Sequence, residues 1–379
     1  MTYVLAWKTR NGVYLLADSA ITNRGIVSLP FSNTSFGEKV IAATTGTVSE
    51  GGLKIVRVGR MAIAFAGSAL YGYNIASTVK TLLAFGASPA DSLRHVVENR
   101  LDRPANLRLV ATFVGADGPV LLAFNEDGLA QWEDVKVGNM VQLGNAPGWL
   151  MELSLRFLGL FAKSQLPPRD YLALSLAWAQ GYGIRHALMQ FGIGGPCLGL
   201  VCHSTGLDWH ADTLFVLYDQ HAGTGDWVAS VVRENAHVVI SSVSKRQSVF
   251  SAEGFGPDVT GEWANGAAES IYEGKFTYVC ILSTTLHTMA VVVMNSELRH
   301  QDLRLGIFRR QGEFRIEVAL SAALIHELKT PLEEKGPRWL PIKVIWRPNA
   351  PTDLSIPDPQ WSWLKAARVA EGHCDIQKS

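Results

Sequence analysis

Two apolar runs stand at the beginning of the chain, Tyr3–Trp7 and Val13–Ala17, with polar residues and Asn11-Gly12 between them. Runs of this length separated by a short polar turn are typical of a β-hairpin, and Asn-Gly supplies the positive φ angles that a tight turn needs. The second run leads directly into Asp18-Ser19. The pattern therefore predicts a hairpin whose second strand ends at an acidic residue.

Strand-like and helix-like patterns then alternate in blocks. Strands are expected at Leu53–Val58, Met61–Ala66, Leu107–Val114, Val120–Asn125, Val141–Asn145, Cys197–His203 and Thr213–Tyr218. Helices are expected at Leu70–Ala84, from Pro89 to about Leu101 behind an N-cap at Ser88, at Gly148–Ala162 and at Arg169–His186. Residues 23–52, rich in Gly, Ser, Thr and Asn, read as a connection with one short strand at Lys39–Ala43.

This order of strands, two helices, strands, two helices and strands is the one that an αββα sandwich requires. In such an α+β fold two antiparallel sheets pack face to face and the helices lie outside. We therefore expect a four-layer domain over residues 1–218.

Residues 219–379 have a different pattern, of alternating or short apolar runs. These predict strands at Trp227–Arg233, Ala236–Ser242, Phe276–Ser283, Thr288–Met294, Arg304–Arg309 and Phe314–Ala319. A short helix is expected at Leu320–Leu328, followed by an extended tail rich in Pro and Trp. These patterns predict a mainly β extension. The sequence does not fix the boundary between this extension and the first domain.

Composition excludes several classes of protein. Hydrophobic residues make up 47% of the 379 residues and charged residues 18%, which is typical of a well-buried globular protein. The net charge is zero, which disfavours a general nucleic-acid binder. No run reaches the roughly eighteen apolar residues of a membrane span, and Lys8 and Arg10 interrupt any signal-like segment. Four cysteines without a CxxC pair fit a reducing compartment, so we expect a cytoplasmic protein.

Candidate chemistry begins at Thr2, which follows only Met1. Because threonine is small, we expect an aminopeptidase to remove Met1. Thr2 would then carry a hydroxyl and a free α-amine, and the amine is placed to act as the general base for the hydroxyl.

With its hairpin and its Ala17-Asp18-Ser19, this start resembles the proteasome β subunits and their bacterial relatives, which are N-terminal-nucleophile (Ntn) hydrolases. The spacing from Thr2 to Asp18 matches that of the family, and Met1-Thr2-Tyr3 is similar to the start of bacterial proteasome-like proteins such as Anbu. The resemblance covers about residues 1–218. It implies the αββα fold, hydrolysis through the N-terminal threonine, and assembly into a homo-oligomer.

The same resemblance implies the other site residues. Asp18 matches the family's catalytic aspartate. For the lysine we select Lys54, which begins the strand pair leading into Phe65-Ala66-Gly67, with Lys39 as the alternative. Gly67 matches the glycine whose amide serves the oxyanion hole, and Ala66 or Ser68 takes that position if the alignment slips by one residue.

Later positions depart from the family pattern. Family members usually have a serine near the turn expected at Gly144-Asn145, and an aspartate and a serine just before a Gly-Gly pair. Here Gly194-Gly195 follows Met189-Gln190-Phe191-Gly192-Ile193, and Gln190 stands about where the aspartate would be. These departures put the activation of the amine in question.

The sequence thus favours a threonine-type hydrolase of peptide or amide bonds, with Thr2, Asp18, Lys54 and Gly67 as site residues. No cofactor is expected, and no metal, because the spacing of His203, His210, Cys197 and Cys202 fits no standard zinc pattern. Two alternatives stay open: a proteasome-like scaffold that does not cleave peptides, and an amidase for small molecules. The sequence does not predict the substrate, the geometry of a ring or an unfoldase partner.

Overall fold

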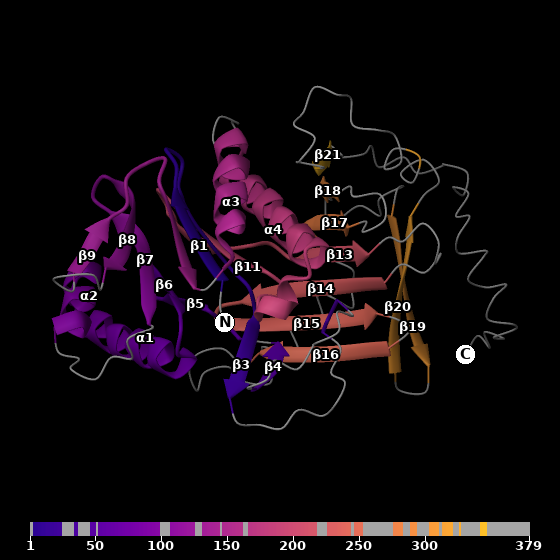
Figure 1. Cartoon of the computed structure of the whole chain (residues 1–379), viewed down its shortest axis with the longest axis horizontal. Coiled ribbons are helices and arrows are strands. Elements are labelled where there is room, and N and C mark those ends of the chain that lie inside the picture. Colours follow the sequence, from indigo (N-terminus) through magenta and orange to yellow (C-terminus); the bar gives the residue numbers. More distant parts are fainter. Residues whose placement is uncertain are drawn as a thin grey trace, which may run out of the picture. The chain divides into compact units, whose positions relative to one another are not determined.

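The computed structural model describes residues 3–24, 34–36, 46–50, 52–98, 107–125, 131–144, 146–161, 166–217, 226–243, 246–252, 276–282, 289–293, 303–310, 313–320, 326 and 342–346. The chain forms two compact units, each described here by itself (Figure 1). The first comprises residues 1–211, 231–239 and 250–267, and the second comprises residues 212–230, 240–249 and 268–379.

One five-stranded antiparallel sheet in the first unit contains the beginning of the chain. Its strand order is β10-β1-β2-β11-β12, with β1 at Tyr3–Lys8, β2 at Val13–Ala17, β10 at Met140–Gly144, β11 at Leu198–His203 and β12 at Gly206–Trp209. Strand β1 pairs with β10 on one side and β2 on the other. The N-terminal strand is therefore interior to its sheet.

The hairpin predicted between β1 and β2 is confirmed, but the expected turn conformation is wrong. Neither Asn11 nor Gly12 is among the described residues with a positive φ. The loop is instead closed by Thr9, whose N–H donates to the carbonyl of Gly12 at 2.8 Å. Glycine is needed at position 12 for space, because a Cβ there would lie 2.8 Å from the carbonyl oxygen of Cys202 on β11.

A second five-stranded antiparallel sheet has the order β5-β6-β7-β8-β9. Its strands are Ile55–Val58, Met61–Ala66, Arg108–Gly115, Gly118–Asn125 and Gln131–Asp134. Alternate residues of the two sheets, such as Val4, Leu15, Ala64, Val110 and Leu200, form one buried cluster. This cluster is the core between the sheets, and burial drives their packing.

Helices cover the outer faces of both sheets. Helices α1 (Ala69–Ala84) and α2 (Pro89–Glu98) bury Ile75, Val79 and Leu93 against β5–β8. Helix α2 has the expected cap, with the Asp91 N–H donating to Ser88 Oγ at 3.1 Å.

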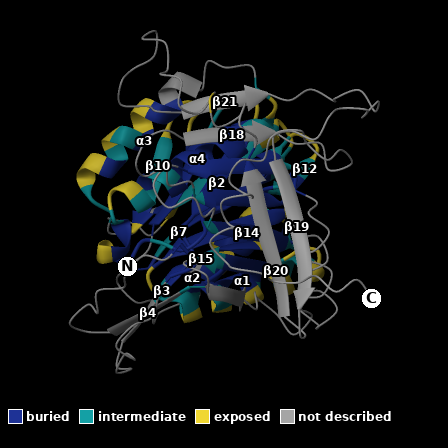
Figure 2. Ribbon diagram, turned by 90° about the vertical axis from the view of Figure 1, so that its right-hand side faces the viewer, coloured by how far each residue is buried: buried dark blue, intermediate teal, exposed yellow. Residues whose placement is uncertain are grey.

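Helices α3 (Gly148–Phe161) and α4 (Pro168–Arg185) lie on the sheet that contains β1. The Tyr171 ring of α4 packs on the rings of Trp7 and Tyr14. Figure 2 shows the buried residues on the strands and the exposed outer positions of α3. The predicted α+β four-layer αββα sandwich is confirmed.

The long connection contains more regular structure than expected. Strands β3 (Ala20–Arg24) and β4 (Gly46–Glu50) form a two-stranded antiparallel sheet within residues 20–50. The strand expected at Lys39–Ala43 lies outside the described residues. Both observed strands carry polar residues at most positions, so their apolar pattern is weak.

The described residues of the later part of the chain lie mainly in β-strands, as predicted. A seven-stranded mixed sheet has the order β16-β15-β14-β13-β17-β18-β21, and β19 pairs with β20. These strands are β13 (Thr213–Leu217), β14 (Asp226–Arg233), β15 (Ala236–Val243), β16 (Arg246–Ala252), β17 (Tyr278–Leu282), β18 (Met289–Val293), β19 (Leu303–Arg310), β20 (Glu313–Leu320) and β21 (Ile342–Trp346).

Two expectations for this region have different outcomes. The helix predicted from Leu320 is wrong at its first residue, because Leu320 pairs with Leu303 as the end of β20. The domain boundary at residue 218 stays a prediction. In the described part of the chain, no helix combines the length and the apolar character needed to cross a membrane.

Candidate functional site

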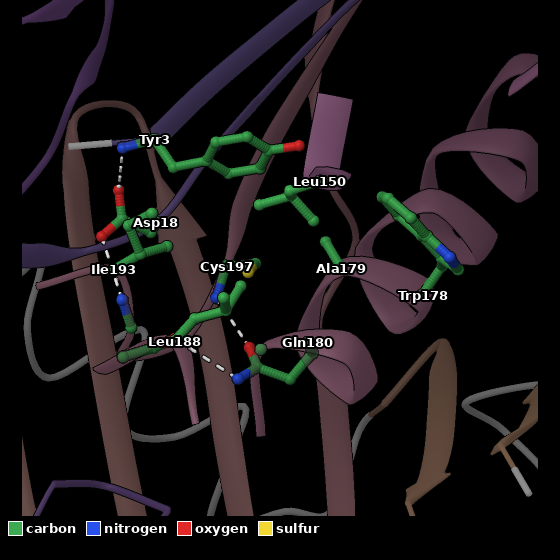
Figure 3. A pocket seen from close by; sticks show the side chains of 12 residues that line it. Tyr3, Asp18, Leu150, Trp178, Ala179, Gln180, Leu188, Ile193 and Cys197 are labelled. Atoms are coloured by element: carbon green, nitrogen blue, oxygen red, sulfur yellow. Dashed lines mark hydrogen bonds between the residues drawn. The ribbon is translucent and has the colours of Figure 1, made fainter. Parts of the chain in front are cut away.

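Asp18 is the centre of a buried polar cluster at the end of β2. Its Oδ1 accepts the backbone N–H of Tyr3 at 2.8 Å and the ammonium of Lys54 at 2.6 Å. Its Oδ2 accepts the backbone N–H of Gly194 at 3.1 Å. The Asp18 side chain is 1% exposed, so its charge is held by these three donors. Figure 3 shows Asp18 with its contact to the Tyr3 N–H. The Asp18 carboxylate therefore links three segments. These are the first residue of β1, the catalytic candidate Lys54 and the turn at Gly194.

Lys54 precedes β5 and points into the interior. Its side chain is 5% exposed, and its own carbonyl accepts the N–H of Phe65 on β6. Burial lowers the pKa of Lys54 below its ordinary value, and the charge of Asp18 opposes that shift. A buried lysine paired with one carboxylate supplies positive charge in a place with little solvent screening.

The structure therefore brings Asp18 and Lys54 together. Lys39, the alternative lysine, lies outside the described residues, and so does Thr2. The N–H that Asp18 binds belongs to Tyr3, the residue that follows Thr2 in the sequence.

Gly67 lies between β6 and α1, at an exposed position. Its φ of 107° is open to glycine and strained for other residues. It comes two residues after Phe65, which bonds to the backbone of Lys54. The described contacts join Asp18 to Lys54 but do not join either of them to Gly67, so its role as an oxyanion donor stays a prediction.

A small cavity of about 20 Å³ adjoins the Asp18 cluster, and Figure 3 shows its lining. Tyr3, Asp18, Gln180, Ile193 and Cys197 are among the residues around it. Tyr3 reaches across to α3, where its hydroxyl lies 3.0 Å from Ser154 Oγ. Burial raises the pKa of the Tyr3 phenol, so the hydroxyl keeps its proton.

Gln180, on α4, was not found from the sequence. Its Oε1 accepts the N–H of Cys197 at 2.9 Å, and its Nε2 donates to the carbonyl of Gly195 at 3.4 Å. Gln180 is 3% exposed and directly follows the helix segment Leu172–Ala179, which is apolar except for Ser175. The sequence signal for Gln180 was a polar residue next to apolar ones on a helix. If such a residue is buried, its side-chain amide needs hydrogen-bond partners.

The departures from the family pattern have a visible consequence here. Gln190 is exposed, and Ile193 is buried in the cavity wall. Neither position brings a polar side chain to Asp18. The backbone N–H of Gly194 serves as a donor instead. Gly144 ends β10 opposite Tyr3, and Asn145 lies outside the described residues.

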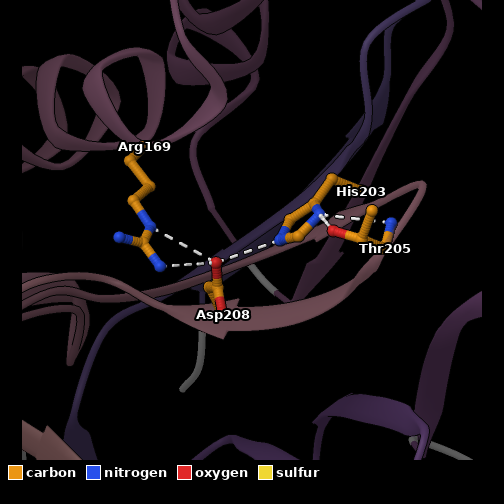
Figure 4. Close-up of polar contacts among 4 residues, drawn as sticks. All are labelled: Arg169, His203, Thr205 and Asp208. Atoms are coloured by element: carbon orange, nitrogen blue, oxygen red, sulfur yellow. Dashed lines mark hydrogen bonds and ion pairs between the residues drawn. The ribbon is translucent and has the colours of Figure 1, made fainter.

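His203 belongs to a polar network with Asp208, Arg169 and Thr205 (Figure 4). Its Nε2 lies 3.0 Å from Asp208 Oδ2 on β12, and the same oxygen accepts Arg169 Nη2 of α4 at 2.9 Å. Partial burial would raise the pKa of Asp208, but hydrogen bonds from His203 and Arg169 outweigh it and hold the pKa below its ordinary value. No cluster of three His, Cys, Asp or Glu side chains suited to a metal occurs among the described residues.

Comparisons with known proteins find similarity only to solved structures, and that similarity is distant. No family model and no curated protein matches the chain. Two solved structures of Anbu from Hyphomicrobium sp. strain MC1 are similar to it. The first, a Gly-1 mutant, has 14% identity and a TM-score of 0.37 over 55% of this chain and 84% of that one. The second has 13% identity and a TM-score of 0.36 over 55% and 86%. Both likenesses are remote and span about half of this chain.

Proposed function

We propose that this protein is a threonine-type hydrolase of peptide or amide bonds, with Thr2 as nucleophile after Met1 is removed. One observation carries the proposal. A buried Lys54–Asp18 ion pair, 2.6 Å long, shares its carboxylate oxygen with the N–H of Tyr3, the residue next to Thr2. An N-terminal nucleophile needs a nearby cation, held in place, to favour ionisation of its hydroxyl.

The reaction follows acyl-transfer chemistry. The Thr2 hydroxyl attacks the substrate carbonyl carbon while the α-amine of Thr2 takes the proton. The Gly67 N–H donates to the oxyanion, and the Lys54 ammonium lowers the pKa of the attacking hydroxyl. The C–N bond then breaks as the amine leaving group receives the proton, which leaves an ester on Thr2. Water, deprotonated by the α-amine, hydrolyses the ester and restores the hydroxyl.

The wider setting is part of the same proposal. The protein acts in the cytoplasm as a homo-oligomer, in line with the assembly that the sequence resemblance implies. It uses no cofactor, and no unfoldase partner is specified. Asp18 has no proton-transfer step in this scheme, because it holds Lys54 and the start of β1.

The test begins with the mature protein. Intact mass and N-terminal sequencing should reveal a chain that starts at Thr2. A peptide epoxyketone, which reacts with both the hydroxyl and the α-amine of an N-terminal threonine, should then add one equivalent of mass. Thr2→Ala should abolish the adduct, while Thr78→Ala, an exposed threonine on α1, should leave it intact. Undiminished labelling of Thr2→Ala would contradict the proposal.

A second candidate function is a scaffold that does not cleave peptides. It is favoured by the exposed Gln190, which stands about where the family has an aspartate, and by the lack of a serine in the residues just before Gly194-Gly195. Retention of Met1 would select this function, because Thr2 would then have no free amine. If Met1 is removed, turnover of small amides without turnover of peptides would select a small-molecule amidase.

A further inference from the structure

The β11–β12 hairpin presents a hydroxyl, an imidazole and a carboxylate in one line of contacts (Figure 4). Thr205 Oγ1 lies 2.9 Å from Nδ1 of His203, and Nε2 of the same ring lies 3.0 Å from Asp208 Oδ2. The hydroxyl and the carboxylate therefore contact opposite nitrogens of one imidazole. Serine hydrolases activate their nucleophile with the same order of groups, although there the two ring nitrogens are exchanged.

A further hydrogen bond fixes which nitrogen of His203 carries the proton. The backbone N–H of Thr205 donates to Nδ1 of the ring at 3.4 Å. Because an amide N–H can only donate, Nδ1 is the acceptor, and the neutral ring carries its proton on Nε2 and donates it to Asp208. The lone pair of Nδ1 therefore faces the Thr205 hydroxyl, as the lone pair of a general base must.

Asp208 is held in place by a second element. Arg169, in the first turn of α4, donates from Nη2 and Nε to the Asp208 oxygen that His203 contacts, at 2.9 and 3.3 Å. The Arg169 side chain is 66% exposed, and an ion pair with so exposed a partner contributes little to folding. The contacts of Arg169 orient the carboxylate, and the carboxylate in turn orients the imidazole.

The Thr205 hydroxyl is open to reagents from solvent. The loop between β11 and β12 has only two residues, Ser204 and Thr205, and both are exposed. Ser204 offers a hydroxyl one residue away, but none of the contacts described for this hairpin joins it to His203. The loop therefore contains an internal control for the effect of the imidazole.

We propose that Thr205 is a nucleophile separate from Thr2, and that it takes an acyl group from a small thioester or aryl ester with His203 as general base. The hydroxyl oxygen bonds to the carbonyl carbon while its proton passes to Nδ1 of His203. The bond from that carbon to the leaving group then breaks, and the thiol or phenol departs with the proton. The product is an ester on Thr205.

The geometry of the loop selects activated esters over amides. The backbone N–H of Thr205 donates to His203 Nδ1, so it is not available to an oxyanion. Without that donor the reaction depends on a leaving group that departs readily, as a thiol or a phenol does and an amine does not. This inference does not rest on the proposed function of Thr2, which uses its own α-amine as the base.

The first test treats the purified full chain with p-nitrophenyl acetate and locates the acetyl groups by tandem mass spectrometry. Hydroxylamine removes an acetyl ester but leaves acetyl-lysine intact, so labelling of lysines is read apart. Thr205 should gain its ester about 100-fold faster than Ser204, the contribution typical of a general base. Equal rates at the two hydroxyls would overturn the proposal without the need for a variant. Each adduct is assigned to its own residue, so the result at Thr2 is separate.

Variants then test the base. His203→Gln should lower the rate at Thr205 to that of Ser204, and His95→Gln, an exposed histidine on α2, should leave it unchanged. Thr205→Ser should keep the label, because it retains the hydroxyl. Labelling of Thr205 at the parent rate in His203→Gln would overturn the role of the imidazole.

Nitrogen NMR of the imidazole tests the positioning residue. The neutral ring of His203 should carry its proton on Nε2 in the parent protein, and Asp208→Ala should lose this preference. A parent ring with its proton on Nδ1 would overturn the assignment of the base. An unchanged ring in Asp208→Ala would show that Asp208 does not orient it.

Discussion

At the scale of single residues, Asp18 shows how a side chain can be both buried and charged. It accepts one ammonium and two backbone N–H groups, from three segments far apart in the sequence. Desolvating an ion pair costs several kcal/mol, which the mutual attraction and added hydrogen bonds repay only when the geometry is good. The pair is therefore expected to be sensitive to the loss of either partner.

Lys54→Met should destabilise the protein by about 3–5 kcal/mol, because it leaves the Asp18 charge buried without its cation. Asp18→Asn should be destabilising for the converse reason, while the double variant should lose less than the sum of the two. Urea unfolding of the four proteins of this double-mutant cycle measures the coupling.

Lys136→Ala is the matched control for that cycle. Lys136 pairs with Asp134 at 2.8 Å, but its side chain is 75% exposed. An exposed pair contributes about 0–1 kcal/mol, so this variant should unfold almost as the parent does. Additive effects in the Lys54 and Asp18 cycle would show that the two side chains are not coupled in solution.

At the scale of elements, helix α4 holds the turn at Gly194-Gly195, which follows it in the sequence. Gln180 satisfies the carbonyl of Gly195 and the N–H of Cys197, and these flank the turn whose Gly194 N–H reaches Asp18. The helix therefore positions the candidate site through one amide side chain.

Gln180→Leu should destabilise the protein by about 2 kcal/mol or more, since it leaves two backbone groups buried without partners. It should also slow labelling of Thr2 without preventing the removal of Met1, because the Asp18 cluster loses one of its supports. Ser175→Ala is the control on the same helix: its hydroxyl bonds only to the carbonyl of Tyr171 one turn away. Equal unfolding curves for both variants would refute a positioning role for Gln180.

Elements with strong apolar patterns were predictable from the sequence. The β1–β2 hairpin, the β5–β6 pair and all four helices were expected at nearly their observed positions, because buried faces demand apolar residues. Strands β9 and β12 were not predicted, because each has only four residues and neither has a clear apolar pattern; Gln131–Asp134 is also mostly polar. Their pairing is imposed by neighbouring strands, which a local pattern does not encode.

The candidate site, like the fold, was predictable only where its residues lie next to strands with a clear apolar pattern. Asp18 and Lys54 stand in or beside strands with clear patterns, so their meeting could be expected. Gln180 acts through partners that lie more than a dozen residues further along the chain. Sequence spacing carries no signal for such contacts, which depend on how the loops return to the sheets.

At the scale of the whole molecule, the first compact unit is discontinuous in sequence. Val232 packs with Leu53 and Leu198 in one buried cluster. Asn235, in the turn between β14 and β15, exchanges two hydrogen bonds of 2.8 Å with the backbone of Arg57 on β5. Part of the later chain thus completes the unit that contains the candidate site.

Asn235→Ala should lower the free energy of unfolding by about 1–2 kcal/mol through the loss of these two bonds. Arg57→Ala is the control, because Asn235 bonds to the backbone of residue 57 and not to its side chain. Chemical denaturation followed by tryptophan fluorescence compares the two. A larger loss for Arg57→Ala than for Asn235→Ala would contradict this account.

The interior position of β1 has a consequence for the order of events during synthesis. Strand β1 is made first, but it pairs with β10, and its hairpin partner β2 pairs with β11. The ribosome must therefore produce the chain through Trp209, the end of β12, before this sheet is complete, which takes roughly ten to forty seconds at 5–20 residues per second. During that time the beginning of the chain is accessible to a processing enzyme. If Met1 is removed, we therefore expect its removal to take place on the growing chain, before this sheet is complete.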